Sequence, residues 1–134
     1  MSDEQKAAKG GIAKARSYKD LLVWQKGMAL AKGIYGITRL SPDEEKFGLV
    51  SQMRRAAVSI PSNIAEGQAR HTTKEFIQFI SHAEGSVAEL ETQLMLAVDL
   101  GYCIPHQAGE VFRLITDLRN MLNALRRTLS RNDA

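Results

Sequence analysis

The chain has 134 residues, of which 44% are hydrophobic and 25% charged, and its formal net charge is +3. This length predicts one domain that can bury a core of its own, and the charged fraction is ordinary for a soluble globular protein. A single cysteine excludes an intrachain disulfide and a Cys-x-x-Cys site. No apolar run approaches the roughly 20 residues that span a membrane. We therefore expect a cytoplasmic protein without membrane contact.

The N-terminal segment differs in composition from the rest. Residues 1–17 are rich in lysine, alanine and glycine and contain four basic and two acidic residues. This composition predicts a disordered basic tail at 1–17, followed by a helical domain at 18–131. Since the domain is close to neutral, total charge is a weak argument for nucleic-acid binding.

The first predicted helix runs from Leu21 to Arg39, with Asp20 as its N-cap. It carries two adjacent apolar stripes, a wider face than one antiparallel neighbour covers. The stripes are Leu21, Trp24, Met28, Ala31 and Tyr35, and Val23, Leu30, Ile34 and Ile37. Its three glycines indicate either a closely approaching backbone or a poorly optimised helix. The wide face and the glycines together suggest burial beyond one copy of the chain.

The second predicted helix has a strong start signal and an internal proline. Ser41–Glu44 combines a capping serine, a proline suited to the first helical position, and a capping-box glutamate. Pro61 predicts a bend or break, because proline removes a hydrogen bond and crowds the preceding turn. The hydroxyls of Ser59 and Ser62 are expected to bond the backbone groups that the proline frees. The helix should stop around Gly67–Arg70.

The third and fourth helices have the clearest periodicity. A capping box from Thr72 to Glu75 starts the third helix, Gly101 caps its end, and the fourth starts near Pro105 and frays from Ser130. Their apolar seams, spaced by four and three, are Phe76, Ile80, Ala83, Val87, Leu90, Leu94 and Ala97, and Val111, Ile115, Leu118, Leu122, Leu125 and Leu129. Such seams and short connections predict an all-α, antiparallel up-down-up-down four-helix bundle.

The sequence contains no recognisable catalytic or metal-binding pattern. A di-iron bundle needs a glutamate three residues before a histidine, and none of the three histidines has one. The chain has no glycine-rich phosphate loop, and no histidine lies near Ser59 or Ser62 in the sequence. We expect a non-enzymatic protein without cofactor or metal.

Charge is distributed unequally between the last two helices. Residues Lys74–Leu100 contain one lysine and five acidic residues, a net charge of −4, whereas Pro105–Arg131 contain five arginines and two acidic residues, a net charge of +3. One interpretation is pairing along the shared edge, with little gain from each exposed pair. The other is contact with phosphates by a shared face formed by Arg113, Asn120, Arg127 and Arg131. No aromatic residues alternate with these arginines, so a base-stacking platform is not predicted.

Arg54 and Arg55 lie about 100° apart around their helix, so both cannot face the same place. One can pair with Glu66 or an acidic residue of the third helix, and the other can point outward, across a subunit interface or to nucleic acid. The candidate nucleic-acid-binding residues are therefore Arg113, Arg119, Arg126, Arg127, Arg131, Arg54, Arg55, Arg70 and Lys74.

Four stretches of the chain resemble a known family. They are YKDLLVWQKG, PDEEKFGLVSQMRRAAVSIPSNIAEG, TKEFIQFI and GSVAELETQLMLAVDLGY. These stretches, above all the second, resemble the bacterial proteins encoded by intervening sequences of 23S ribosomal RNA genes. The resemblance implies antiparallel four-helix bundles that assemble into homopentamers. The accessory variability proteins of diversity-generating retroelements are related in fold and associate with a reverse transcriptase and nucleic acid.

Two hypotheses follow for function. The first is a homo-oligomeric protein, a pentamer by resemblance, that associates with RNA or DNA through arginines of the fourth helix. The second is a protein-binding scaffold, an accessory factor of a reverse transcriptase, without direct nucleic-acid readout.

Overall fold

The computed structural model describes residues 17–45 and 48–133, and it contains four long helices and no strand in these residues. The all-α prediction is confirmed, while the tail predicted at 1–17 lies outside the described residues except for Ser17. The elements are η1 (Tyr18–Asp20), α2 (Leu22–Thr38), η2 (Asp43–Glu45), α3 (Leu49–Gln68), α4 (Thr73–Asp99) and α5 (Pro105–Asp133).

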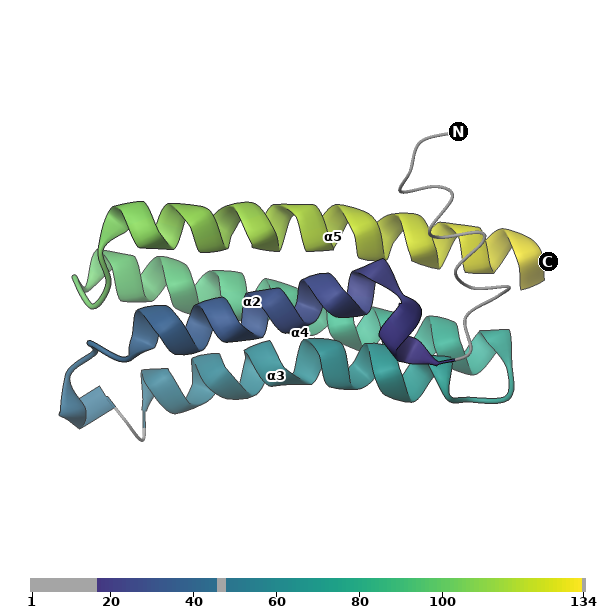
Figure 1. The fold of residues 1–134 in the computed structure, drawn as a ribbon, viewed down its shortest axis with the longest axis horizontal. Helices are drawn as coiled ribbons and strands as arrows, with labels where there is room; N and C mark the ends of the chain where they lie inside the picture. The colour runs from purple at the N-terminus through teal and green to yellow at the C-terminus, as the bar shows by residue number, and fades with distance from the viewer. Residues whose placement is uncertain (1–16, 46–47, 134) are drawn as a thin grey trace.

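The four helices lie side by side along one long axis (Figure 1). α3 packs against α2 and α4, and α5 packs against α4 and α2, so that each helix has two principal neighbours. In Figure 1 the α2–α3 and α4–α5 connections lie at one end of the bundle, and the α3–α4 connection lies at the other. The C-terminus of α5 is at the same end as the α3–α4 connection.

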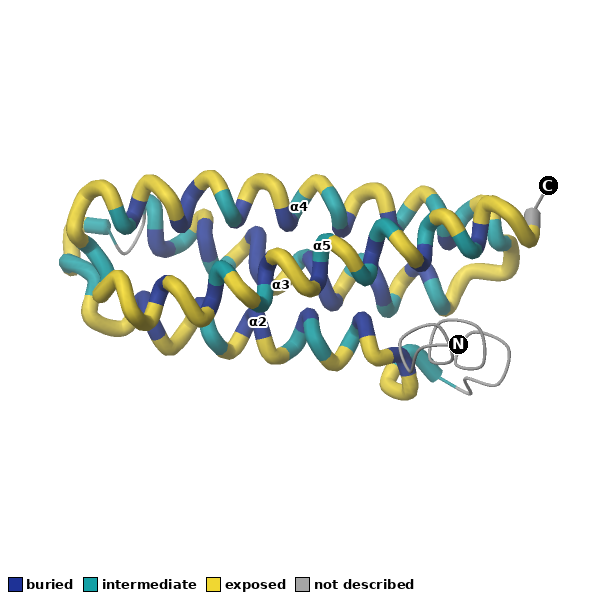
Figure 2. The backbone as a smooth tube through the Cα atoms, turned by 90° about the horizontal axis from the view of Figure 1, so that it is seen from above, coloured by how far each residue is buried: buried dark blue, intermediate teal, exposed yellow. Residues whose placement is uncertain are grey.

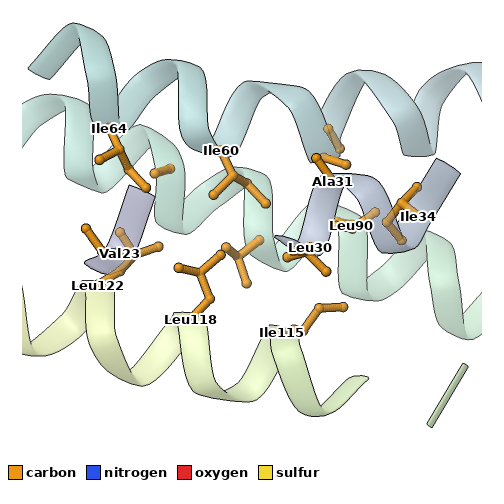
Figure 3. Close-up of a cluster of buried hydrophobic side chains, with 14 of the residues drawn as sticks. Val23, Leu30, Ala31, Ile34, Ile60, Ile64, Leu90, Ile115, Leu118 and Leu122 are labelled. Carbon is orange, nitrogen blue, oxygen red and sulfur yellow. The ribbon is translucent and has the colours of Figure 1, made fainter. Parts of the chain in front are cut away.

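The core runs along the centre of the bundle, and the buried positions of every helix face it (Figure 2). All the seam residues predicted in α4 and α5 are buried. Side chains from all four helices meet in this core, as Figure 3 shows. Leu30, Ile60, Leu90 and Leu118 are each 0% exposed. Burying one such side chain contributes about 1.5–3 kcal/mol, so these contacts stabilise the fold strongly.

The two stripes of α2 have different environments. Val23, Leu30, Ile34 and Ile37 are all buried in the core. In the other stripe Leu21 and Ala31 are buried, Trp24 and Met28 are half-buried, and Tyr35 remains 43% exposed. The wide apolar face predicted from the sequence is therefore only partly covered within this chain.

The glycines of α2 also differ. A Cβ at Gly27 would lie 3.5 Å from the backbone nitrogen of Pro61, so α3 does approach closely there. A Cβ at Gly33 would contact only side chains, and one at Gly36 would meet no atom within 4 Å. The predicted close approach of a backbone is therefore present at Gly27.

The predicted N-cap of the first helix and the predicted start of the second helix are wrong. Asp20 belongs to η1, which Ser17 caps by accepting a hydrogen bond from the Lys19 N–H at 3.2 Å, and α2 begins only after it. Residues 43–45 form the short turn η2, so α3 begins at Leu49. The Leu49 N–H donates to Glu45 Oε2 at 3.1 Å, and this carboxylate takes the role expected of a capping serine. At the other end of the chain, α5 remains helical to Asp133 rather than fraying from Ser130.

Pro61 lies inside α3, which continues on both sides of it, so the predicted break does not occur and the bend stays a prediction. The side chain of Pro61 is buried. The Ser59 hydroxyl donates to the Ala56 carbonyl at 2.6 Å, and that of Ser62 donates to the Val58 carbonyl at 2.8 Å. These carbonyls flank that of Ala57, the one a proline at 61 deprives of its partner. The prediction that these hydroxyls bond the freed group is therefore wrong, because each bonds a carbonyl one position away from it.

Both ends of α4 follow the sequence prediction. The Glu75 N–H donates to Thr72 Oγ1 at 3.1 Å, and the Thr72 hydroxyl donates to the Glu75 carboxylate at 2.9 Å. Gly101 has a φ of 76°, and the Tyr102 N–H donates to the Ala97 carbonyl at 2.9 Å. This pattern is a Schellman C-cap, which favours glycine because a Cβ is strained at positive φ.

Candidate nucleic-acid interface

The outward face of α5 carries a line of polar and basic side chains opposite its apolar seam. Spacings of seven, seven and four residues keep them within about 40° around the helix axis over roughly 27 Å. All four are exposed, and none of the arginines forms an ion pair with a described residue. We call this surface the α5 stripe; it comprises Arg113, Asn120, Arg127 and Arg131.

The other two arginines of α5 face α4 instead. Arg119 Nη2 lies 2.6 Å from Glu91 Oε1, and Arg126 Nε donates to Glu84 Oε1 at 2.8 Å. For Arg119 and Arg126 the structure therefore shows ion pairs along the shared edge of α4 and α5. Because all four side chains are a quarter or more exposed, solvent screens each pair and keeps its contribution small.

Two carboxylates lie near the α5 stripe. Glu110 is three residues before Arg113, and its Oε1 lies 3.8 Å from Nε2 of His106. Asp117 is four residues from Arg113, and its Oδ2 lies 3.9 Å from Lys26 Nζ of α2. This ion pair directs the aspartate toward the α2 side of the helix. The stripe therefore keeps a net positive charge along its length.

Arg54 and Arg55 diverge as the sequence predicts. Arg55 is exposed, whereas Arg54 is half-buried between α3 and α2. Arg54 Nε donates to Thr38 Oγ1 at 3.0 Å, and its guanidinium carbon lies 4.5 Å from the centre of the Tyr35 ring. Neither arginine pairs with Glu66 or with a described carboxylate of α4, so that suggested pairing is wrong.

The remaining candidates lie at the end of the bundle where α3 and α4 connect. The guanidinium carbon of Arg70 lies 4.7 Å from the centre of the Phe79 ring, and Lys74 is exposed in the first turn of α4. Arg131, in the last turn of α5, lies at the same end of the bundle. The predicted site residues thus form separate groups rather than one patch.

The structure offers little chemistry beyond charge. No group of three metal-ligating side chains occurs within residues 17–45 and 48–133. Burial raises the pKa of the Cys103 thiol, which favours the protonated and less nucleophilic form. Among the described helices, none has the length and apolar character needed to cross a membrane.

The fold and its surfaces define a class: a four-helix bundle with an uncompensated basic face on its last helix. A family model described as 23S rRNA-intervening sequence protein matches residues 19–124, and the chain belongs to this family. A crystal structure of a protein of unknown function from the S23 ribosomal protein family of Bacteroides thetaiotaomicron is similar, with a TM-score of 0.73 and 23% identity. The match covers 79% of this chain and 96% of that one, and it supports the fold. No curated protein matches the chain.

Sequence reasoning missed one part of this surface. Tyr35 belongs to a predicted apolar stripe, and no pattern in the sequence indicates that Arg54 of α3 lies over its ring. The relation to retroelement accessory proteins stays a prediction, since the family match concerns the intervening-sequence proteins.

Proposed function

We propose that the chain is a non-enzymatic, homo-oligomeric protein of the bacterial cytoplasm that binds nucleic acid through the α5 stripe. The observation that carries this proposal is the exposure of Arg113, Arg127 and Arg131 without a carboxylate partner among the described residues. Arginines on such a face attract phosphates independently of base sequence and release counterions on binding. The neighbouring Asn120 adds a neutral side chain that can donate to a phosphate oxygen.

The salt dependence of binding tests this proposal. Three phosphate contacts predict that log K falls with log salt with a slope of about −2 to −3 per subunit engaged. Fluorescence anisotropy with labelled RNA and DNA at low salt should show binding that weakens with this slope. Replacing Arg113, Arg127 and Arg131 together by Gln should abolish it.

A matched control removes charge from the same helix. The double variant Arg119→Gln with Arg126→Gln removes two arginines that already pair with carboxylates of α4. Its nucleic-acid affinity should therefore fall much less than that of the triple variant. If the wild-type protein does not bind at low salt, or if the triple variant binds with an unchanged salt slope, the proposal is wrong.

Self-association is supported by apolar side chains near one end of the bundle. Met95 and Leu96 of α4, and Leu100 and Ile104 of the connection that follows it, are each 49–55% exposed, and Leu40 is 80% exposed. Gathered apolar side chains of this kind mark interaction surfaces. Light scattering at micromolar concentration should give an oligomer, and a pentamer if the family resemblance extends to assembly. A monomer there removes this part of the proposal.

The same apolar side chains support the alternative function, a scaffold for another protein such as a reverse transcriptase. Size-exclusion chromatography of the purified protein at two absorbance wavelengths separates the two functions. Co-purifying nucleic acid without a specific protein favours nucleic-acid binding. A stoichiometric protein partner without nucleic acid favours the scaffold.

A further inference from the structure

The guanidinium of Arg54 is fixed in place between α2 and α3. Its Nε donates to Thr38 Oγ1 at 3.0 Å, and its guanidinium carbon lies over the Tyr35 ring, 4.5 Å from the ring centre. Thr38 is only 5% exposed, and its own hydroxyl donates to the Ile34 carbonyl at 2.7 Å, which leaves a lone pair for the arginine. α2 therefore holds one edge and one face of the guanidinium. Because the side chain has already lost most of its rotamer freedom, binding a ligand costs little further conformational entropy.

The outer part of this guanidinium has no partner among residues 17–45 and 48–133. Among the described residues, no acceptor bonds Nη1 or Nη2 of Arg54, and no carboxylate forms an ion pair with it. The C-terminus of α2 nearby supplies a partial negative charge of only about half a unit. Arginine presents its terminal N–H groups as a planar fork that fits two oxygens of one oxyanion. The two terminal nitrogens of Arg54 are thus held in place, and no group of the described part of the chain occupies them.

Two further cations lie on the same side of α2. Lys32 and Arg39 are three residues before and four residues after Tyr35, which places them on adjacent positions of the helix surface. Both are exposed and neither forms an ion pair with a described residue. Of the three acidic residues that follow α2, Asp43 and Glu44 are exposed, and Glu45 is engaged by the Leu49 N–H and the Tyr102 hydroxyl. Three positive charges around one ring favour a dianion over a carboxylate.

We propose that Arg54 binds one phosphate group, with Tyr35 and Thr38 positioning the guanidinium and Lys32 and Arg39 adding charge. The group is a free phosphate, a small phosphate ester or a phosphate of a nucleic-acid backbone. This site lies on the α2–α3 face and contains no residue of the α5 stripe. It stands whether or not the stripe binds nucleic acid.

Titration of the folded protein with inorganic phosphate, followed by NMR, tests the site. The ring signals of Tyr35 and the amide signal of Thr38 should shift and saturate with a midpoint of about 1–10 mM, as expected for a small ion held by few groups. Sodium chloride at matched ionic strength should not reproduce the shift. Arg54→Lys keeps the charge but loses the fork and should weaken binding about tenfold or more.

Arg55→Lys is the matched control, because Arg55 is the exposed neighbour without these contacts, and it should leave the titration unchanged. If Arg54→Lys does not fold, Thr38→Val removes the positioning hydroxyl while keeping the arginine, and it should weaken binding too. Equal shifts in wild-type and Arg54→Lys proteins, or no shift up to about 50 mM phosphate, would overturn the proposal.

An oligothymidylate without terminal phosphates identifies the source of the phosphate. If it shifts the same signals in the α5 triple variant, the backbone is a ligand of the site; if only inorganic phosphate does so, the ligand is a small phosphate. If nucleic-acid binding measured by anisotropy is absent but phosphate still shifts the NMR signals, only the proposed function is contradicted. If phosphate does not shift the NMR signals but nucleic-acid binding is seen by anisotropy, only the phosphate site at Arg54 is contradicted.

Discussion

Replacing Gly67 by alanine should destabilise the bundle, although alanine is the better helix former. A Cβ at Gly67, near the end of α3, would lie 2.7 Å from the Cβ of Phe79 and 2.9 Å from Cδ1 of Phe76. The Cβ of Phe79 is fixed to the backbone of α4, so it cannot move away by a rotamer change. α3 and α4 would have to separate locally.

The two opposing contributions can be compared. Overpacking of a tight contact costs about 1–3 kcal/mol, and the short distance places this site in the upper half of that range. The higher helix propensity of alanine stabilises the folded state by about 1 kcal/mol or less. We therefore expect a net loss of about 1–2 kcal/mol in the free energy of unfolding.

Gly85→Ala is the matched control. Gly85 lies in the middle of α4, and a Cβ there would meet no atom within 4 Å, so the same substitution should stabilise by about 0.5–1 kcal/mol. Urea unfolding followed by circular dichroism, at two protein concentrations to separate folding from assembly, measures both values. If Gly67→Ala is as stable as the wild-type protein while Gly85→Ala gains stability, the close contact between α3 and α4 is wrong.

Three further results are expected. Leu90→Asp would bury an unpaired carboxylate in the core and should cost several kcal/mol, whereas unchanged melting would contradict the core position of Leu90. Gly101→Ala places a Cβ at a φ of 76° and should cost about 1 kcal/mol in chemical denaturation, and a gain in stability would contradict this backbone conformation. A double-mutant cycle on Arg126 and Glu84, each changed to Gln, should give a coupling of about 1 kcal/mol or less that weakens with salt, and a larger coupling would contradict a solvent-screened pair.

The seams of α4 and α5 could be predicted because heptad spacing alone decides which positions of a long helix face its neighbours. The caps at Thr72 and Gly101 could be predicted for a similar reason, since each depends on residues within one turn. The start of α3 could not. Ser41–Glu44 has the composition of a helix start, but the residues that follow decide whether such a turn propagates, and here α3 begins only at Leu49.

The candidate surface was predictable in part. The α5 stripe follows from residue spacing on one helix, and the structure places all four of its residues in solvent. Opposite net charges predicted pairing between α4 and α5, but the relative rotation of the two helices decides that Arg119 and Arg126 are the paired arginines. The contact of Arg54 with Tyr35 depends on how far α3 covers α2, which the sequence of neither helix reveals alone.

Gly27 and Pro61 belong to different helices, and each would weaken an isolated one. In the folded chain the proline ring of α3 lies against the glycine of α2, with 3.5 Å between a Cβ at position 27 and Pro61 Cβ. A methyl group fills this space, and a longer side chain does not fit. The ring and the glycine therefore favour one register of the two helices: sliding α2 so that Val23 meets the proline would bring a branched side chain there and push the helices apart. A side chain larger than that of alanine at position 27 should therefore destabilise the packing of α2 on α3.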